Sequence, residues 1–376
     1  MKKPRVAVIV GTRPEAIKMA PVIRALRQSR ALLPVTISTS QHREMVREVF
    51  RDFGITRFDD LQMMRRGQTL WNLSSRLAAA LGRYLEAHPV DAVLVQGDTS
   101  TALFGGLCAF YHRIPVGHVE AGLRTGDRYS PFPEEINRRL LGALATWHFA
   151  PTRDAVKQLK REGAPGRAVF LTGNTVVDAL RWMAPRNNDM TLRKLVGREG
   201  MKRRLVLVTC HRRESFGAPM RRIAGAIETV ARAHDDIIVL FPVHPNPEVR
   251  RAVVPRLGSV PNVVLCPPLD YAQFLSVLKH ACFVLSDSGG VQEEAAALGK
   301  PVLVLREHTE RQEGVRAGAL KLVGADPGRI TQESERLLRD ANTYRNMNRP
   351  SNVFGDGHAA RRIVKILEER LRKQAR

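Results

Sequence analysis

The chain has 376 residues, a mass of 42.0 kDa and a formal net charge of +23, and 44% of its residues are hydrophobic. The apolar content excludes a disordered chain and the length exceeds that of one small domain, so two domains are expected. The positive charge suggests three classes of partner, namely nucleic acid, an acidic membrane surface and phosphorylated ligands.

Short β-branched runs alternate with longer amphipathic stretches along the chain. Near-continuous apolar runs separated by helical patterns, such as 69–87 and 220–233, are typical of parallel strands covered on both faces by helices. The sequence therefore predicts a doubly wound α/β fold. The expected strands form two series, one at 6–10, 35–38, 92–96, 115–119 and 147–150, and one at 205–209, 237–243, 263–265, 283–286 and 301–305.

Segment 181–203 separates the two series and is rich in charged residues, with a proline and an Asn-Asn-Asp run. It predicts an N-terminal domain over 1–172 and a C-terminal domain over 173–357. The amphipathic segment 358–376 is expected to form a helix that packs back on the first domain. Two such domains facing each other across a cleft would direct the carboxyl ends of their strands to a shared ligand site.

The first strand ends in Gly11-Thr12-Arg13-Pro14-Glu15, with Lys18 one turn further along. Glycine permits a tight turn, and proline suits the first turn of a helix. The N–H groups of this turn, with Arg13 and Lys18, can hold an anion. The alternative is a capped helix start with two surface cations. The segment is neither GxGxxG nor a Walker A loop, so NAD and ATP are not supported.

Three carboxylates follow at strand or helix ends. Asp98 follows the strand at 92–96, Glu120 follows the strand at 115–119, and Glu134 opens a helix. Such groups are suited to acid–base catalysis. The alternatives are that Asp98 caps the next helix and that Glu134 favours the helix dipole or pairs with Arg138 at i,i+4.

The second series carries its own polar turns. His211 follows the strand at 205–209, where a histidine can contact phosphate or move a proton, or simply be structural. Ser288-Gly289-Gly290 follows the strand at 283–286, and its N–H groups can approach a diphosphate, with Arg311 as an added cation. Glu294, one turn into the helix, can accept hydrogen bonds from ribose hydroxyls. The alternative is a plain glycine turn that starts a helix.

Several classes of partner and cofactor are not expected. The arginines are spread along the chain, whereas a nucleic-acid-binding arm concentrates its charge in one block. The four cysteines show no zinc-binding spacing, and we expect no metal and no cofactor. No apolar run reaches the length of a signal peptide core or of a membrane span of about 20 residues. We therefore expect a cytoplasmic protein without a membrane or nucleic-acid partner.

Together these motifs resemble the family of non-hydrolysing UDP-N-acetylglucosamine 2-epimerases. The resemblance covers residues 11–311 in the family's order, and a Gly-Asp-Gly turn at 355–357 extends it. The matching segments include GTRPEAIKMAP (11–21), QHREM (41–45), QGDTST (96–101), PVGHVEAGLRTGD (115–127), PEEINR (133–138), TGNTVVDAL (172–180), HRRESFG (211–217), PVHPNP (242–247), SDSGGVQEEA (286–295) and TER (309–311).

The resemblance implies two Rossmann-like domains arranged as in GT-B glycosyltransferases, a homodimer, and a UDP-sugar substrate. It also implies that UDP-GlcNAc and UDP-ManNAc are interconverted without metal or nicotinamide. The reaction would be an anti elimination of UDP to 2-acetamidoglucal followed by readdition with inverted C2. The catalytic group carried over by motif is Asp98, Glu120, Glu134 and His211, with Asp98 as the principal proton-transfer residue at C2.

Other residues match the family's binding sites. The residues that resemble its UDP-binding set are Arg13, Lys18, Ser288, Gly289, Gly290 and Arg311, with Glu294 at the ribose and Phe274 and the backbone near Leu269 at the uracil. A second nucleotide sugar acts as an activator in some relatives, and the residues that match its neighbourhood are Gln41, Arg43, Arg212 and His244. Relatives with that activator site carry an arginine where Gly67 aligns. The rival functions are epimerisation of a related UDP-2-acetamido sugar, GT-B glycosyl transfer and nucleic-acid binding.

Overall fold

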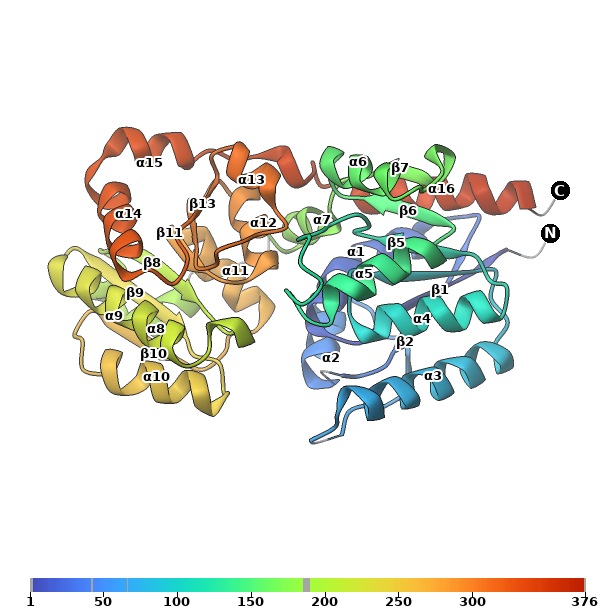
Figure 1. Cartoon of the computed structure of the whole chain (residues 1–376), viewed down its shortest axis with the longest axis horizontal. Coiled ribbons are helices and arrows are strands. Elements are labelled where there is room, and N and C mark those ends of the chain that lie inside the picture. Colours follow the sequence, from blue (N-terminus) through green and yellow to red (C-terminus); the bar gives the residue numbers. More distant parts are fainter. Residues whose placement is uncertain (1–2, 42, 66, 185–189, 375–376) are drawn as a thin grey trace. The chain divides into compact units, whose positions relative to one another are not determined.

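The computed structural model divides into two units, each with its own sheet (Figure 1). Unit 1 comprises Met1–Trp182 and Phe354–Arg376, and unit 2 comprises Met183–Val353. Residues 185–189, which are part of the segment 181–203 that separates the two strand series, lie outside the described residues. The structure describes residues 3–41, 43–65, 67–184 and 190–374.

Among the described residues, unit 1 contains a seven-stranded parallel sheet with the order β3-β2-β1-β4-β5-β6-β7. Its central strands are apolar and buried on both faces, as expected for a parallel sheet covered by helices. The strands are β1 (Arg5–Val10), β2 (Leu33–Ser38), β3 (Asp59–Asp60), β4 (Ala92–Gln96), β5 (Val116–Val119), β6 (Trp147–Ala150) and β7 (Val169–Leu171).

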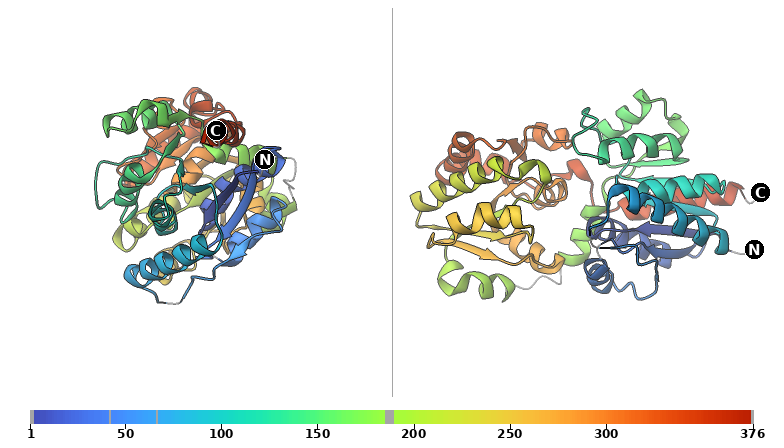
Figure 2. Two further views of the ribbon diagram at one scale, coloured as in Figure 1. Left: turned by 90° about the vertical axis from the view of Figure 1, so that its right-hand side faces the viewer. Right: turned by 60° about the horizontal axis from the view of Figure 1, so that its bottom comes forward.

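Helices cover both faces of this sheet. The helices of unit 1 are α1 (Arg13–Gln28), α2 (Arg43–Asp52), α3 (Leu70–Ala87), α4 (Ser100–Tyr111), α5 (Glu134–Leu144), α6 (Arg153–Arg161), α7 (Thr175–Met183) and α16 (Ala359–Gln374). Helix α4 packs between α3 and α5 over one apolar cluster, while α1 contacts α2 and α16 (Figure 2). The last helix therefore returns to the first domain.

Unit 2 repeats the architecture with a six-stranded parallel sheet in the described residues, in the order β10-β9-β8-β11-β12-β13. The strands are β8 (Arg204–Thr209), β9 (Ile237–Pro242), β10 (Val263–Cys266), β11 (Ala281–Ser286), β12 (Val302–Val304) and β13 (Leu320–Leu322). The helices are α8 (Met190–Gly200), α9 (Ala218–Ala233), α10 (Pro247–Leu257), α11 (Tyr271–His280), α12 (Gly289–Ala297), α13 (Gln312–Arg316), α14 (Pro327–Arg339) and α15 (Ala341–Met347). Helix α9 packs between α10 and α14 over the main core of the unit.

The predicted α/β class is confirmed, and each of the ten expected strands is present. The sequence missed β3, β7 and β13, which are two or three residues long. All three lie at an edge of their sheet. A short edge strand carries no buried apolar run, so its residues give no periodic signal.

The boundaries between the two units lie after Trp182 and after Val353, whereas the sequence predicted them after residues 172 and 357. Helix α7 belongs to unit 1, because Asp178 accepts hydrogen bonds from the N–H groups of Ala359 (3.1 Å) and Ala360 (2.9 Å) at the start of α16. The N–H of Asn174 also donates to the carbonyl of Phe354 at 2.7 Å. These bonds join α7 and the residue before it to the start of α16 and the turn before it.

Both sheets reverse their strand order at one place. In unit 1 the reversal lies between β1 and β4, and in unit 2 it lies between β8 and β11. In doubly wound sheets, ligands bind outside the carboxyl ends of the strands at this switch point. The polar turns after β1, β4, β8 and β11 are those that the sequence singled out.

Candidate functional site

The turn after β1 is closed by Glu15. The Glu15 carboxylate accepts hydrogen bonds from the N–H groups of Gly11 (3.2 Å) and Thr12 (2.8 Å) and from the hydroxyls of Thr12 (2.7 Å) and Thr99 (2.7 Å). Burial raises the pKa of Glu15 to about 7, although the hydrogen bonds from Thr12, Thr99 and Gly11 oppose the increase. Because Thr99 caps α4, Glu15 joins the turn after β1 to the turn after β4.

Gly11 is required by crowding. A Cβ at this position would lie 2.6 Å from Thr39 Oγ1 and even closer to Thr101 Oγ1, and those two hydroxyls are hydrogen-bonded at 2.8 Å. Thr12 occupies the N-cap of α1, and Pro14 lies in its first turn. Arg13 is the partly exposed first residue of α1. The turn is thus a capped helix start that also presents a cation.

Glu120 follows β5 with a positive φ of 64° and is buried. Its Oε1 accepts hydrogen bonds from Lys18 Nζ at 2.6 Å and from Asn174 Nδ2 at 3.1 Å, and its Oε2 accepts one from Gln96 Nε2. The ammonium of Lys18, expected at the UDP, thus forms a buried ion pair with a candidate catalytic carboxylate.

Asp98 does not cap α4, and that alternative is wrong. Thr99 is the N-cap, and its hydroxyl accepts from the N–H of Ala102. Arg138 contacts Asp98 Oδ2 through Nε at 2.8 Å and through NH2 at 2.7 Å. Asn137 donates to the Asp98 carbonyl at 2.8 Å. Helix α5 therefore orients Asp98.

Glu134 is the first residue of α5, where the helix dipole favours a carboxylate. The same helix carries Arg138, whose NH1 donates to Glu135 at 3.2 Å. Arg138 thus bridges Asp98 and Glu135. Glu134 therefore lies on the element that contacts the turn after β4.

Two buried histidines lie behind these carboxylates. His118 on β5 pairs in register with His148 on β6, and His118 Nε2 is 2.7 Å from the carbonyl of Gly97, next to Asp98. Burial lowers the pKa of His118 to about 3 and that of His148 to about 4. Both rings are neutral at physiological pH, and the bond to Gly97 holds the backbone beside Asp98.

In unit 2, the turn after β11 leads into α12 with Ser288 at the N-cap. The first N–H groups of a helix have no acceptor within it and attract anions. A Cβ on Gly290 would meet nothing within 4 Å, so the chain is open there. A Cβ on Gly289 would lie 2.7 Å from Arg311 Cζ, so this glycine admits the Arg311 guanidinium against the start of α12.

Arg311 is held by acidic residues. Its Nε donates to Glu293 at 2.9 Å, and its NH1 forms an ion pair with Glu310. Glu310 also accepts from Arg306 NH1 at 2.9 Å, and Arg306 Nε donates to Glu214 at 2.6 Å. This largely buried chain of alternating charges fixes the Arg311 side chain beside the turn after β11.

His211 follows β8 by two residues, and its side chain is half exposed. The His211 ring stacks on His244 with centroids 5.9 Å apart and planes 18° apart. His211 Nδ1 lies 3.6 Å from Asp287 Oδ1. The structure therefore places His211 at the switch point of unit 2, beside the turn that carries Ser288.

The remaining binding candidates of unit 2 surround two helix starts. Leu269 is buried just before Asp270, the N-cap of α11, and Phe274 lies partly buried in the first turn of that helix. Glu294 is buried on α12, one turn beyond Gly290.

The four candidate activator residues come from both units. Gln41 and Arg43 belong to unit 1, whereas Arg212 and His244 belong to unit 2. Gln41 Nε2 is buried without a hydrogen-bond partner among the described residues. His42, within the matching segment 41–45, lies outside the described residues.

Several residues at the carboxyl edges of the two sheets were not predicted from the sequence. They lie inside the matching segments, so the signal was present, but their partners are distant in the chain. The missed residues are Glu15, His118, Glu135, Asn174, Asp287, Glu293 and Glu310. The sequence predicted Arg138 only as a partner of Glu134, not of Asp98.

A surface groove of about 510 Å³ in unit 2 is lined by none of the candidate residues. No group of three or more His, Cys, Asp or Glu side chains suited to a metal ion occurs among the described residues. No described helix is long and apolar enough to cross a membrane.

The fold and the polar turns define a protein of two Rossmann-like domains with polar side chains at both switch points. A family model described as UDP-N-acetylglucosamine 2-epimerase matches residues 24–368. The chain belongs to this family of isomerases, and the resemblance read from its motifs is confirmed.

Individual relatives agree over nearly the whole chain. The UDP-N-acetylglucosamine 2-epimerase of Yersinia pestis is 47% identical over 369 residues, which cover 97% of this chain and 98% of the relative. The UDP co-structure of S. aureus MnaA has a TM-score of 0.93 at 43% identity and covers 98% of this chain and 97% of its own. The Neisseria meningitidis UDP-GlcNAc 2-epimerase bound to UDP-GlcNAc has a TM-score of 0.93 at 41% identity, covering 97% of this chain and 100% of its own.

Proposed function

We propose that the protein interconverts UDP-GlcNAc and UDP-ManNAc without hydrolysis. UDP would leave by anti elimination to give 2-acetamidoglucal, and would add back with inverted C2. The observation that carries the proposal is the set of carboxylates at the carboxyl edge of the unit 1 sheet, formed by Asp98, Glu120 and Glu134. The Neisseria meningitidis relative, described as bound to UDP-GlcNAc, supports the choice of substrate.

The C2 proton is poorly acidic, so cleavage of the C1–O bond must develop positive charge on the sugar as the proton leaves. Asp98 is suited to take the C2 proton. Arg138 contacts Oδ2 through both Nε and NH2, so this pair engages one of the two carboxylate oxygens, Oδ2 and not Oδ1. A carboxylate oriented through one oxygen presents the other to the substrate.

Glu120 and Glu134 are assigned to the charge that develops at the sugar. Lys18, Asn174 and Gln96 hold the Glu120 carboxylate in place, and such fixed charges stabilise a transition state without reorganising. Glu134 would assist elimination and readdition from the start of α5.

UDP would bind in unit 2. The start of α12 supplies N–H groups of Gly289 and Gly290, and Arg311 lies fixed beside it. These groups suit a diphosphate, which must be held in place for the return step. His211 would contact the phosphate or the glycosidic oxygen, Glu294 the ribose, and Leu269 with Phe274 the uracil. Arg13 would add a cation from unit 1. We also propose that the protein is a homodimer.

The test is incubation with UDP-GlcNAc in deuterated water without acceptor or metal, followed by NMR of the sugar. We expect UDP-ManNAc that carries deuterium at C2. The Asp98→Asn variant should fold normally and lose C2 exchange, whereas Asp154→Asn, a surface change on α6, should retain it. UDP-GlcNAc is supplied in excess, so that it can also fill an activator site. The absence of both UDP-ManNAc and deuterium exchange at C2 under these conditions would contradict the proposed function.

A further inference from the structure

Asp287 lies at the switch point of unit 2, between the end of β11 and Ser288, and is fully buried. Its carboxylate accepts hydrogen bonds from four groups of the segment after β8. The donors are the N–H of His211 (2.9 Å), the N–H of Arg212 (2.8 Å), the hydroxyl of Ser215 (2.9 Å) and the thiol of Cys210 (3.2 Å).

A buried carboxylate is costly unless donors surround it. Here every donor comes from one short loop, so satisfying the carboxylate also fixes the course of that loop. Burial and the neighbouring Asp287 raise the pKa of Cys210 well above its ordinary value, which keeps the thiol protonated and able to donate. The N–H of Asp287 donates to the Thr209 carbonyl at 3.2 Å, so backbone and side chain join the same two turns.

The ring of His211 is within reach of the same carboxylate. Its Nδ1 lies 3.6 Å from Asp287 Oδ1, a separation at which a protonated ring gains an ion pair. The other ring beside it is that of His244, stacked at 5.9 Å. Asp287 therefore acts on both the backbone and the side chain of His211.

We infer that Asp287 is the positioning residue of His211: it holds the loop after β8 against the Ser288 turn, so that the His211 ring is presented in one orientation. The inference rests on the proposed function, in which His211 acts on the departing UDP. A loop that moves would misplace His211 in the transition state and leave the start of α12 intact. A misplacement of about 1 Å costs on the order of 100-fold in rate.

The first test is Asp287→Asn, which keeps the shape but replaces one acceptor oxygen with an amide nitrogen that repels the loop's donors. We expect kcat to fall about 100-fold, with little change in the Kd of UDP. The matched control is Asp340→Asn. Asp340 accepts from the N–H groups of Asn342 (2.8 Å) and Thr343 (3.2 Å) and from the Thr343 hydroxyl (2.6 Å), but it is exposed at the start of α15. This control should keep the wild-type kcat.

A double-mutant cycle with His211→Asn separates positioning from a general loss of structure. If Asp287 acts through His211, adding Asp287→Asn to His211→Asn causes no further loss of kcat. Additive losses would overturn the inference. A loss of UDP affinity as large as the loss of kcat would also overturn it, since the effect would then lie in the phosphate turn.

A second readout does not depend on activity. The imidazole ¹⁵N resonances of His211 should shift in Asp287→Asn and stay unchanged in Asp340→Asn. If the wild type lacks epimerase activity, the proposed function fails, and these resonances still decide the inference. If Asp287→Asn does not fold, Ser215→Ala removes one donor and should shift the same resonances with a smaller loss of kcat. Unchanged resonances in the variant that folds would refute the positioning role.

Discussion

Glu15 and Asp287 are buried carboxylates that each join the two turns at the switch point of their own domain. Glu15 joins the turns after the first and fourth strands of unit 1, and Asp287 joins the corresponding turns of unit 2. Both accept from backbone N–H groups and from hydroxyls. Because a carboxylate accepts several such bonds at once, one side chain can hold two neighbouring turns at a switch point.

Glu15 makes the stability of unit 1 depend on pH. Its pKa is about 7 in the folded protein against 4.5 for an ordinary glutamate. Because the pKa of Glu15 is raised on folding, the contribution of Glu15 to the free energy of unfolding is fully present below pH 4.5. This contribution is lost as the pH rises to 7. The loss is about 3 kcal/mol at 1.36 kcal/mol per pKa unit. The Glu15→Gln variant should lack this loss, so its stability relative to wild type should rise over that interval.

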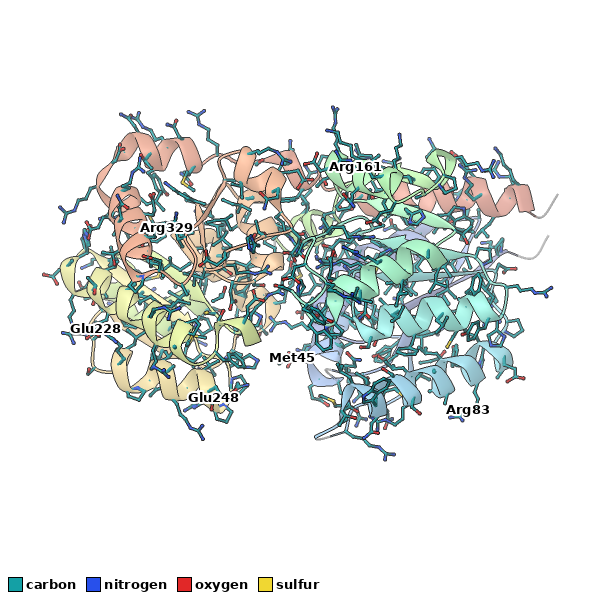
Figure 3. The ribbon with its side chains drawn as sticks, viewed as in Figure 1. Met45, Arg83, Arg161, Glu228, Glu248 and Arg329 are labelled. Atoms are coloured by element: carbon teal, nitrogen blue, oxygen red, sulfur yellow. The ribbon has the colours of Figure 1, made fainter. Side chains whose placement is uncertain are left out.

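Urea unfolding followed by tryptophan fluorescence measures this effect, because Trp71, Trp147 and Trp182 all belong to unit 1. The control is Glu248→Gln, a change on the outer face of unit 2 (Figure 3). Identical pH dependence in wild type and Glu15→Gln would show that Glu15 keeps an ordinary pKa.

Among the elements, helix α16 is separated from the rest of its own unit by the whole of unit 2 in the sequence. It follows unit 2 in sequence, yet it packs on α1 of unit 1. Ser29 after α1 donates to Glu368 of α16 at 2.6 Å. The buried face of α16 consists of Ala359, Ala360, Ile363, Val364, Leu367 and Leu371.

The Leu367→Ala variant should destabilise unit 1. Leu367 is fully buried, and such a truncation removes apolar contact and leaves a cavity, at a cost of about 2–5 kcal/mol. The measurement is the urea midpoint of the tryptophan signal. Lys365→Ala on the exposed side of the same helix should change the free energy of unfolding by less than about 0.5 kcal/mol. Equal effects of the two variants would mean that α16 contributes no packing to unit 1.

At the scale of the whole molecule, the net charge of +23 is mainly a property of the surface. Arg138, Arg306 and Arg311 are buried and paired with carboxylates. In contrast, Arg83 on α3 and Arg329 on α14 are exposed on the outer faces of their units (Figure 3). A surplus of this kind attracts an anionic substrate over a distance that salt shortens.

We therefore expect kcat/KM for the UDP-sugar to fall as ionic strength rises, while kcat at saturation stays constant. Between about 0.01 M and about 0.15 M salt, the Debye length falls from about 30 Å to about 8 Å. Steady-state kinetics across this range give the answer, with sucrose added as an uncharged control. A constant kcat/KM would mean that the surface charge has no part in capture.

The sequence by itself determined the α/β class, ten of the strands and the family, because buried parallel strands and glycine turns leave local patterns. It also brought out Asp98, His211 and Ser288, since polar residues directly after apolar strands stand out. It left open whether Asp98 has a catalytic role or caps the next helix, because aspartate is a common N-cap residue.

Only the tertiary structure decided the partners. Lys18 meets Glu120, and Asp287 meets the His211 loop, across long stretches of chain. Sheet order, rather than distance along the sequence, brings these turns together. The edge strands, the place of α16 and the roles of Glu15 and Asp287 follow from the same cause. Burial and hydrogen bonding depend on what surrounds a side chain, and those surroundings exist only once the strands have taken their order.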